Sequence, residues 1–596
     1  MTESFRTDAV SRRTFVTGLG AGALLLGIPH SSHPNSPTAS TATLRGNHFD
    51  LSIGYRQVNL TGRERQALTI NGGLPGPILR WREGETVTLN VHNQLPDKSS
   101  LHWHGVRVPS DMDGEPGLSF SGIRPGQTFR YRFPVRQSGT YWYHSQSGFQ
   151  QQLGLIGAIV IDPISPEPFS YERDYVVVLS DWSDESPQTI YTHLKKDPDY
   201  YNRQQRTATD LWREVRTKGV ARTWRDRHQW NWKQLSDRNI SQVTGETYTY
   251  LINGHTPDTN WTALFKPGER VRLRLINSAS MTLFDLRIPG LKMKVVAADG
   301  QNVEPVSVDE IRIGSGETYD VIVEPESEQA YSIFAQSMDR SGYARGTLTS
   351  DIRLSAEVPA MDHRPVLTRQ DLGLGRKTEE TDTHFKTTQT AHTEKHSDLP
   401  EATEGGWFYG SLAAAGLGSN SPIIHQPSES NFRVDHRALT PANGISDPGV
   451  GLRNHKNRYN RRVLTYSDLR SNKPTQDQRE PQRELQLHLT GNYERYLWSI
   501  NGENFRDASP LLFRHQERLR ITLVNDTTLP QPMHLHGFWS ELETGDGEYL
   551  PLKHTVIAQP GSSISYLVSA DTYGRWALHS QMLYQRPGMY REVRIV

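Results

Sequence analysis

Short stretches in which polar and apolar residues alternate recur along most of the chain. Residues 86–91 (TVTLNV) and 127–133 (QTFRYRF) have this pattern, which is typical of strands with one buried face. Residues 154–161 are almost continuously apolar, as in a core strand of a β-sandwich. Turn-forming residues, such as NGGLPGP at 71–77, separate these stretches. The pattern predicts an all-β protein built from β-sandwiches.

Similar strands occur in three blocks of the chain. RLRLIN at 272–277 and RITLVN at 520–525 resemble TVTLNV in the first block. Such similarity indicates an internal repeat of three sandwich domains. We therefore predict a signal region at 1–42, a first domain at 43–165, a second at 166–355 with a helical insertion at 183–239, a polar linker at 356–430 and a third domain at 431–596.

The N-terminal region has the pattern of an export signal. Arg12 and Arg13 precede an apolar run at 15–28 that contains four glycines and is too short to span a bilayer comfortably. This arrangement resembles a twin-arginine (Tat) signal, which directs folded proteins across the inner membrane. It predicts a periplasmic mature protein without a membrane span; the alternative is a membrane-anchoring helix.

Composition restricts the chemistry further. The chain has 66 basic and 66 acidic residues, so no charge excess points to nucleic acid or to an anionic membrane as a partner. It has no cysteine, which excludes disulfides, iron–sulfur clusters and thiolate metal sites. A blue copper centre requires a cysteine thiolate and is excluded as well.

In four short motifs a histidine is followed, two positions later, by a second histidine or a glutamine. They are LHWHG at 101–105, YHSQ at 143–146, MHLHG at 533–537 and LHSQ at 578–581. Residues i and i+2 of a strand point to the same face, so a His-x-His strand presents two imidazoles together. Four such motifs, divided between the first and last domains, predict a shared metal site.

These motifs belong to longer segments that resemble the copper-resistance protein A family of periplasmic multicopper oxidases. The segments include LHWHGVRVPSDMDGEPG, FDLRIPGLKMKVVAADGQ, PMHLHGFWSELETGDGEY and GRWALHSQMLYQRPGMYREVRIV. The resemblance runs from the signal to the last residue and is weakest in the linker. It implies an oxidoreductase with three cupredoxin-like Greek-key domains and a trinuclear copper cluster between the first and third.

The resemblance also implies a role for individual positions. The type 2 copper would take His102 and His534. One type 3 copper would take His104, His144 and position 581, which is Gln581; the other would take His536, His579 and position 146, which is Gln146. The type 1 copper would take positions 531, 580 and 585, which are Gln531, Ser580 and Gln585. Met589 would stand near the axial position, although the chain is one residue shorter there.

These replacements change the expected function. A hydroxyl and two carboxamides are poor ligands for Cu(I), so the electron-entry site of an oxidase is expected to be lost. We predict a degenerate member that binds residual copper at its histidines without normal turnover. The alternative is a copper-free pseudo-oxidase scaffold that binds an unidentified protein partner; an active copper-dependent oxidase is the least favoured hypothesis.

The linker lacks the methionine-rich repeats common in this family. Between 356 and 430 the only methionine is Met361. Thioether sulfur suits Cu(I), so copper storage in this segment is not expected. The histidines scattered here are predicted to be solvated loop residues: His363, His384, His392, His396 and His425.

Overall fold

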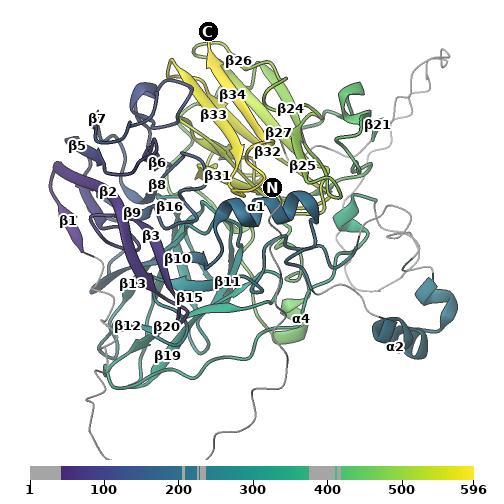
Figure 1. Ribbon diagram of the computed structural model, residues 1–596, viewed down its shortest axis with the longest axis horizontal. Coiled ribbons are helices and arrows are strands. Elements are labelled where there is room, and N and C mark those ends of the chain that lie inside the picture. The colour runs from purple at the N-terminus through teal and green to yellow at the C-terminus, as the bar shows by residue number, and fades with distance from the viewer. Residues whose placement is uncertain (1–41, 204–207, 225–226, 228–235, 375–409, 412–417) are drawn as a thin grey trace, which may run out of the picture. The chain divides into compact units, whose positions relative to one another are not determined.

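The computed structural model describes residues 42–203, 208–224, 227, 236–374, 410–411 and 418–596 of the chain. These residues form six larger β-sheets, two in each of three successive blocks (Figure 1). The all-β class with cupredoxin-like Greek-key sandwiches is therefore confirmed. The predicted signal region, including Arg12 and Arg13, lies outside the described residues.

The first sandwich has sheets with strand orders β1-β4-β9-β8-β6 and β3-β2-β5-β7. Non-consecutive strands pair, as β2 and β5 do in parallel, which is a Greek-key feature. The strands are β1 (Thr43–Arg45), β2 (His48–Asn59), β3 (Glu64–Ile70), β4 (Ile78–Arg82), β5 (Thr86–Asn93), β6 (His102–His104), β7 (Thr128–Pro134), β8 (Gly139–His144) and β9 (Ile156–Asp162); a 3-10 turn, η1 (Ser110–Met112), follows β6.

The second sandwich has strand orders β11-β10-β13-β18-β15-β16 and β12-β20-β19-β14-β17. Its strands are β10 (Arg173–Ser183), β11 (Tyr248–Ile252), β12 (Trp261–Leu264), β13 (Val271–Asn277), β14 (Phe284–Arg287), β15 (Met293–Ala298), β16 (Gln301–Val308), β17 (Glu310–Ile313), β18 (Thr318–Val323), β19 (Ala330–Ser337) and β20 (Tyr343–Thr349).

The predicted helical insertion in the second domain contains α1 (Pro187–Lys196) and α2 (Ala208–Lys218). The start of α1 follows from its sequence, because the Ser186 side chain accepts a hydrogen bond from the Thr189 amide and a proline occupies the first turn. Ile190 and Leu194 of α1 are buried in the core. Within the described residues, none of the helices combines the length and apolar character that crossing a bilayer requires.

The third sandwich has strand orders β25-β24-β27-β32-β29-β30, with β23 beside β32, and β26-β34-β33-β28-β31. Its strands are β23 (Ala442–Asn443), β24 (Arg483–Asn492), β25 (Leu497–Ile500), β26 (Leu511–Phe513), β27 (Arg518–Asn525), β28 (Gln531–Leu535), β29 (Ser540–Leu542), β30 (Leu552–Lys553), β31 (Thr555–Ala558), β32 (Ser562–Ser569), β33 (Arg575–Ser580) and β34 (Tyr590–Ile595). Helix α4 (His455–Tyr459) and the turn η4 (Tyr466–Asp468) precede β24.

The described ends of the predicted linker pack against the sandwiches. They carry η2 (Gln370–Leu372), β22 (Ile423–Ile424) paired with β21 (Gly410–Ser411), and η3 (Pro427–Ser430). His363 is exposed, whereas the side chain of His425 is only 5% exposed. The prediction that His425 is solvated is wrong, because Glu429 and Asp526 enclose it. The other three histidines of this group lie outside the described residues.

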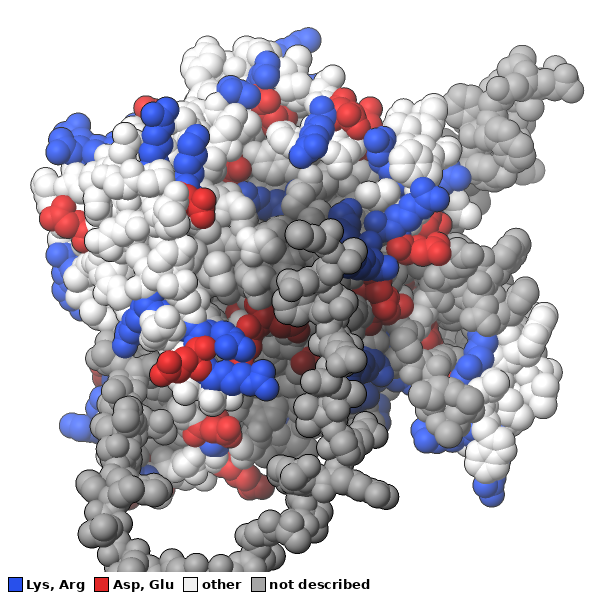
Figure 2. All heavy atoms as spheres, in the orientation of Figure 1, with Lys and Arg blue, Asp and Glu red and all other residues white. Residues whose placement is uncertain are grey.

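Charged side chains of both signs are interspersed on the face shown in Figure 2. This distribution agrees with the equal totals of basic and acidic residues in the sequence. It gives no support to a strongly basic binding surface on this face.

Candidate metal centre

The predicted histidine motifs lie on paired strands. In the first domain β6 pairs with β8, and His102 lies opposite His144. In the third domain β28 pairs with β33, and His534 lies opposite His579. The two-residue period of β6 then brings His104 to the same side as His102. The six imidazoles are at most 1% exposed; they belong to His102, His104, His144, His534, His536 and His579.

The structure brings the histidines of the two domains together. The Nε2 atoms of His102 and His534 are 3.3 Å apart, although 432 positions separate the residues in sequence. The His104 ring stacks on that of His534 with centroids 3.8 Å apart, and His102 stacks on His536 at 4.1 Å. The Nε2 atoms of His536 and His579 are 3.0 Å apart. The six imidazoles therefore form one group between the first and third domains, the six-histidine cluster.

Oxygen acceptors fix the protonation of five of these rings. Each of the five Nδ1 atoms faces a carbonyl or carboxylate oxygen, which only accepts hydrogen bonds, so Nδ1 carries the hydrogen and Nε2 the lone pair. The contacts are His102 to the Asp113 carbonyl at 2.8 Å, His144 to the Ser145 carbonyl at 3.2 Å, His534 to the His554 carbonyl at 2.6 Å, His536 to Asp113 Oδ2 at 2.7 Å and His579 to the Ser580 carbonyl at 2.9 Å.

The resulting donor set fits a metal ion. Two lone pairs facing each other at 3.3 Å or 3.0 Å repel unless a cation or a proton lies between them. Two nitrogens held at about 2.0–2.1 Å from a metal, at angles of about 90–110°, are about 2.9–3.4 Å apart. Both observed separations lie in that range. Imidazole nitrogen is a good ligand for copper and zinc.

Burial favours the neutral form of five of these imidazoles. Loss of solvation, with further effects of neighbouring charges, lowers the pKa values of His104, His144, His534 and His579 well below their usual range. Burial and the neighbouring His102 lower the pKa of His536 to about 4. The neutral form, which binds metals, is therefore the main form at neutral pH.

Asp113 is a functional residue that the sequence analysis missed. Burial alone would raise the pKa of its carboxyl, but the adjacent His536 and His102 hold that pKa well below its usual range. The ionised side chain orients His536, while its backbone carbonyl orients His102. Such hydrogen bonds to the outer nitrogen commonly position metal-binding histidines.

The two glutamines at predicted type 3 positions behave differently. Gln581 Nε2 donates to His104 Nδ1 at 3.3 Å, while His104 Nε2 donates to Thr555 Oγ1 at 3.0 Å. Neither amide atom of Gln146 has a hydrogen-bond partner among the described residues, although the side chain is buried. His144 Nε2 also has no partner there. Buried polar atoms without partners mark a place where a ligand or water is expected.

The predicted type 1 position is occupied by a chain of hydrogen bonds. Ser580 Oγ donates to Gln531 Oε1 at 3.0 Å, and Gln531 Nε2 donates to Gln585 Oε1 at 2.9 Å. Gln585 Nε2 then donates to Gln242 Oε1 at 2.8 Å. Met589 is buried nearby, and its amide donates to the Gln585 carbonyl at 3.0 Å. These amide and hydroxyl groups, already paired with one another, do not fit a blue copper ion.

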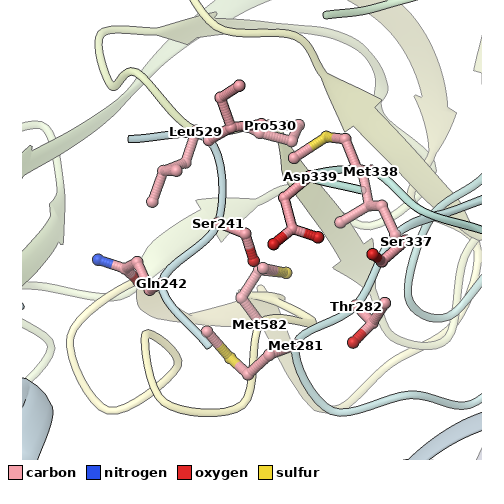
Figure 3. A pocket seen from close by; sticks show the side chains of 12 residues that line it. Ser241, Gln242, Met281, Thr282, Ser337, Met338, Asp339, Leu529, Pro530 and Met582 are labelled. Atoms are coloured by element: carbon pink, nitrogen blue, oxygen red, sulfur yellow. The ribbon is translucent and has the colours of Figure 1, made fainter. Parts of the chain in front are cut away.

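A small pocket adjoins this hydrogen-bonded chain at Gln242 (Figure 3). Met281, Met338 and Met582 line it together with the carboxylate of Asp339. Burial raises the pKa of the Asp339 carboxyl. Sequence reasoning did not predict Gln242 or this pocket, because the residues come from separate strands and loops.

Comparison with known proteins identifies the family. Three multicopper oxidase family models match residues 52–166, 221–352 and 478–596. The chain is 49% identical to copper resistance protein A of Escherichia coli, over 98% of this chain and 99% of the relative. It is 50% identical, with the same coverage, to a copper resistance protein A homolog of Pseudomonas syringae pv. tomato. The chain therefore belongs to the multicopper oxidase family, in the group of copper resistance protein A.

Solved structures agree with this fold. The chain resembles Fet3p, described as a multicopper oxidase that functions in iron import, with a TM-score of 0.61 and 16% identity over 93% of this chain and 90% of that one. It also resembles the laccase from Botrytis aclada, with a TM-score of 0.57 and 20% identity over 93% of this chain and 88% of that one. At these identities the similarity establishes the sandwich architecture alone.

Proposed function

We propose that this protein binds a copper ion at the six-histidine cluster as part of copper resistance, without oxidase turnover driven by an external electron donor. The observation that carries the proposal is the convergence of Nε2 lone pairs from the first and third domains at His102 and His534. The names of its close relatives, copper resistance proteins, support copper as the metal.

Individual residues would have distinct roles in the six-histidine cluster. His102 and His534 would hold the ion, while His144, His536 and His579 offer further Nε2 lone pairs close by. Asp113 and the carbonyl of His554 would keep the bound rings oriented. A bound copper ion would supply a redox-active centre that cycles between Cu(II) and Cu(I). Two buried tryptophans, Trp103 and Trp142, lie next to these histidines and help to exclude water.

The proposed loss of turnover depends on the electron-entry position. The chain contains no cysteine, and Ser580 and the glutamines at 531 and 585 satisfy one another by hydrogen bonds. A copper ion would have to break these bonds to gain weak oxygen ligands. We therefore propose that the type 1 copper is absent and that the cluster, with Gln146 and Gln581 in place of histidines, is depleted.

A copper-free scaffold is the second candidate function. It is favoured by the hydrogen bond from Gln581 to His104, which gives His104 Nδ1 a partner without a metal. In that case the fold would serve as a binding protein for another periplasmic protein. The orphaned amide of Gln146 and the facing lone pairs favour the copper-bound hypothesis instead.

The domain boundaries and the location are also proposals. We propose that residues 1–42 direct export to the periplasm by the twin-arginine pathway. The sandwich domains then correspond to 43–165, 166–355 and 431–596, joined by the segment 356–430. The contact between His102 of the first domain and His534 of the third supports this division.

Metal analysis of the mature protein tests the copper proposal. After loading with Cu(II) and removal of free metal, the protein is expected to retain copper, and a His102→Ala/His534→Ala variant is expected to lose it. A His48→Ala/His363→Ala variant is a matched control, because it removes two exposed imidazoles that lie outside the four histidine motifs. Equal copper in all three proteins would refute the six-histidine cluster as the site, and a parent protein that retains no copper would favour the scaffold function.

A further inference from the structure

A second group of buried side chains with metal-binding donor atoms lies where the end of the linker segment meets the third domain, outside the six-histidine cluster. It consists of His425, Glu429, His488 and Asp526, whose nearest ligand atoms all lie within 4.8 Å of one another. His425 directly follows β22, and Glu429 lies in η3, both at the end of the linker segment. His488 is on β24, and Asp526 directly follows β27, the strand paired with β24. All four side chains are at most 5% exposed.

The two nitrogens of His425 both face oxygen acceptors. Nε2 is 3.1 Å from the Ala438 carbonyl, so it carries a hydrogen and donates it. Nδ1 is 2.7 Å from Glu429 Oε2 and therefore holds either a second proton or a metal ion. The contact thus favours a positive charge at Nδ1.

A proton alone leaves this cluster with unbalanced charge. The two buried carboxylates carry two negative charges, and a protonated His425 compensates one of them. A divalent cation at the centre of the cluster would balance the charge of both carboxylates.

The distances suit such a cation. The His–carboxylate separations are 2.7 Å and 3.8 Å for His425 with Glu429 and Asp526, and 3.4 Å and 2.8 Å for His488 with the same two residues. Ligands at about 2.0–2.1 Å in a tetrahedral arrangement are about 3.3–3.4 Å apart. The observed values scatter around that figure, so small side-chain shifts would complete the geometry.

The atoms that point away from the centre already have partners. Glu429 Oε1 accepts from the Gln426 amide at 3.1 Å, and Asp526 Oδ1 accepts from the Ala438 amide at 2.7 Å. Together with the bond from His425 Nε2 to the Ala438 carbonyl, these contacts hold three of the four ligands in place. Outer hydrogen bonds of this kind support metal ligands in proteins.

Another buried cluster provides a contrast. Glu310, Asp362 and His455 also bring ligand atoms together. Arg461 pairs with both carboxylates, and Arg287 pairs with Asp362 at 3.2 Å. Guanidinium groups therefore supply the positive charge in that cluster. No lysine or arginine has a recorded ion pair with Glu429 or Asp526 in the described part of the chain.

We propose that His425, Glu429, His488 and Asp526 form a site for a divalent d-block cation of the Zn(II) type, which fastens residues 423–438 to the third sandwich. The site uses two imidazoles and two carboxylates, a ligand set that suits zinc. It is separate from the six-histidine cluster and does not depend on the proposed copper function.

The Zn(II) content of the mature protein and two variants tests this site. Each protein is loaded with Zn(II), freed of excess metal and assayed by mass spectrometry. The Glu429→Gln variant is expected to hold about one equivalent less than the parent. The matched control is His436→Asn, which alters a buried histidine of the same segment whose Nε2 bonds the Leu372 carbonyl instead. It is expected to match the parent; equal zinc in the parent and in Glu429→Gln would overturn the proposal.

A second measurement needs no variant. Hydrogen exchange of residues 423–438 in the unaltered protein is compared after chelator treatment and after Zn(II) is restored. The proposal expects slower exchange in this segment with zinc, because the ion joins it to β24 and β27. Unchanged exchange in both states would overturn it, even if the variants proved too unstable to purify.

Discussion

Replacement of Asp113 by asparagine is expected to weaken metal binding at the six-histidine cluster. Asp113 Oδ2 accepts from His536 at 2.7 Å, and Oδ1 lies 3.3 Å from His102 Nδ1. An amide removes the negative charge and, in either orientation, turns N–H groups toward one of these N–H donors. Loss of such an outer partner commonly costs about 10–100-fold in metal affinity, or about 1.4–2.7 kcal/mol. Because Asp113 contacts two rings, we expect the upper half of that range.

Competition with a chelator of known affinity measures this effect. The mature protein and Asp113→Asn are titrated with Cu(II) at neutral pH. Asp111→Asn is the matched control, since Asp111 is an exposed acidic residue on the neighbouring turn η1. The control should bind as the parent does. An affinity of Asp113→Asn within about twofold of the parent would refute the view that this carboxylate orients the ligands.

Three further predictions concern pH, stability and stoichiometry. Since burial lowers the pKa of His536 to about 4, protons compete with metal for this ring only near and below that pH. Cu(II) affinity should be nearly constant from about pH 6 to 8 and fall in acid, which titrations across this range will check. Lys553 is buried between the carboxylates of Asp299, at 3.1 Å, and Glu317, at 2.9 Å. Lys553→Met should therefore lower the free energy of unfolding by about 3–5 kcal/mol in denaturant titrations. An unchanged midpoint would contradict this. Gln146→His should raise the bound copper measured by mass spectrometry, because it adds an imidazole where the glutamine amide has no partner; equal copper would count against that role for position 146.

The strands and histidine pairs were predictable because they depend on local patterns. Alternation identified β5 and β7, and the His-x-His spacing placed His102 and His104 on one side of β6. The resemblance to a known family then implied that the two distant motifs meet. The spacing within each motif was sufficient for this because a strand has a fixed two-residue period.

The partners of these histidines were not predictable from spacing. Four of the five oriented Nδ1 atoms bond backbone carbonyls, and any residue type offers a carbonyl; these carbonyls belong to Asp113, Ser145, His554 and Ser580. Asp113 was within a recognised segment, yet only the fold shows that its carboxylate reaches His536 of another domain. Nothing in the sequence distinguishes Asp113 from the neighbouring Asp111.

The second cluster was missed for a related reason. His425 stands in a polar stretch that resembles a solvated loop, and its partner His488 is 63 positions away on a strand. The four-residue spacing of His425 and Glu429 was the one local signal. The packing of β22 and η3 against the third sandwich gives this signal its meaning, and that packing depends on tertiary contacts.

The visible spectrum and dioxygen consumption of the copper-loaded mature protein test the central claim most directly. The account predicts copper bound without intense blue absorption, and no dioxygen uptake when a phenol or Cu(I) is supplied as reductant. An intensely blue sample that consumes dioxygen while oxidising either reductant would contradict it, because an electron-entry site would then exist without sulfur at position 580.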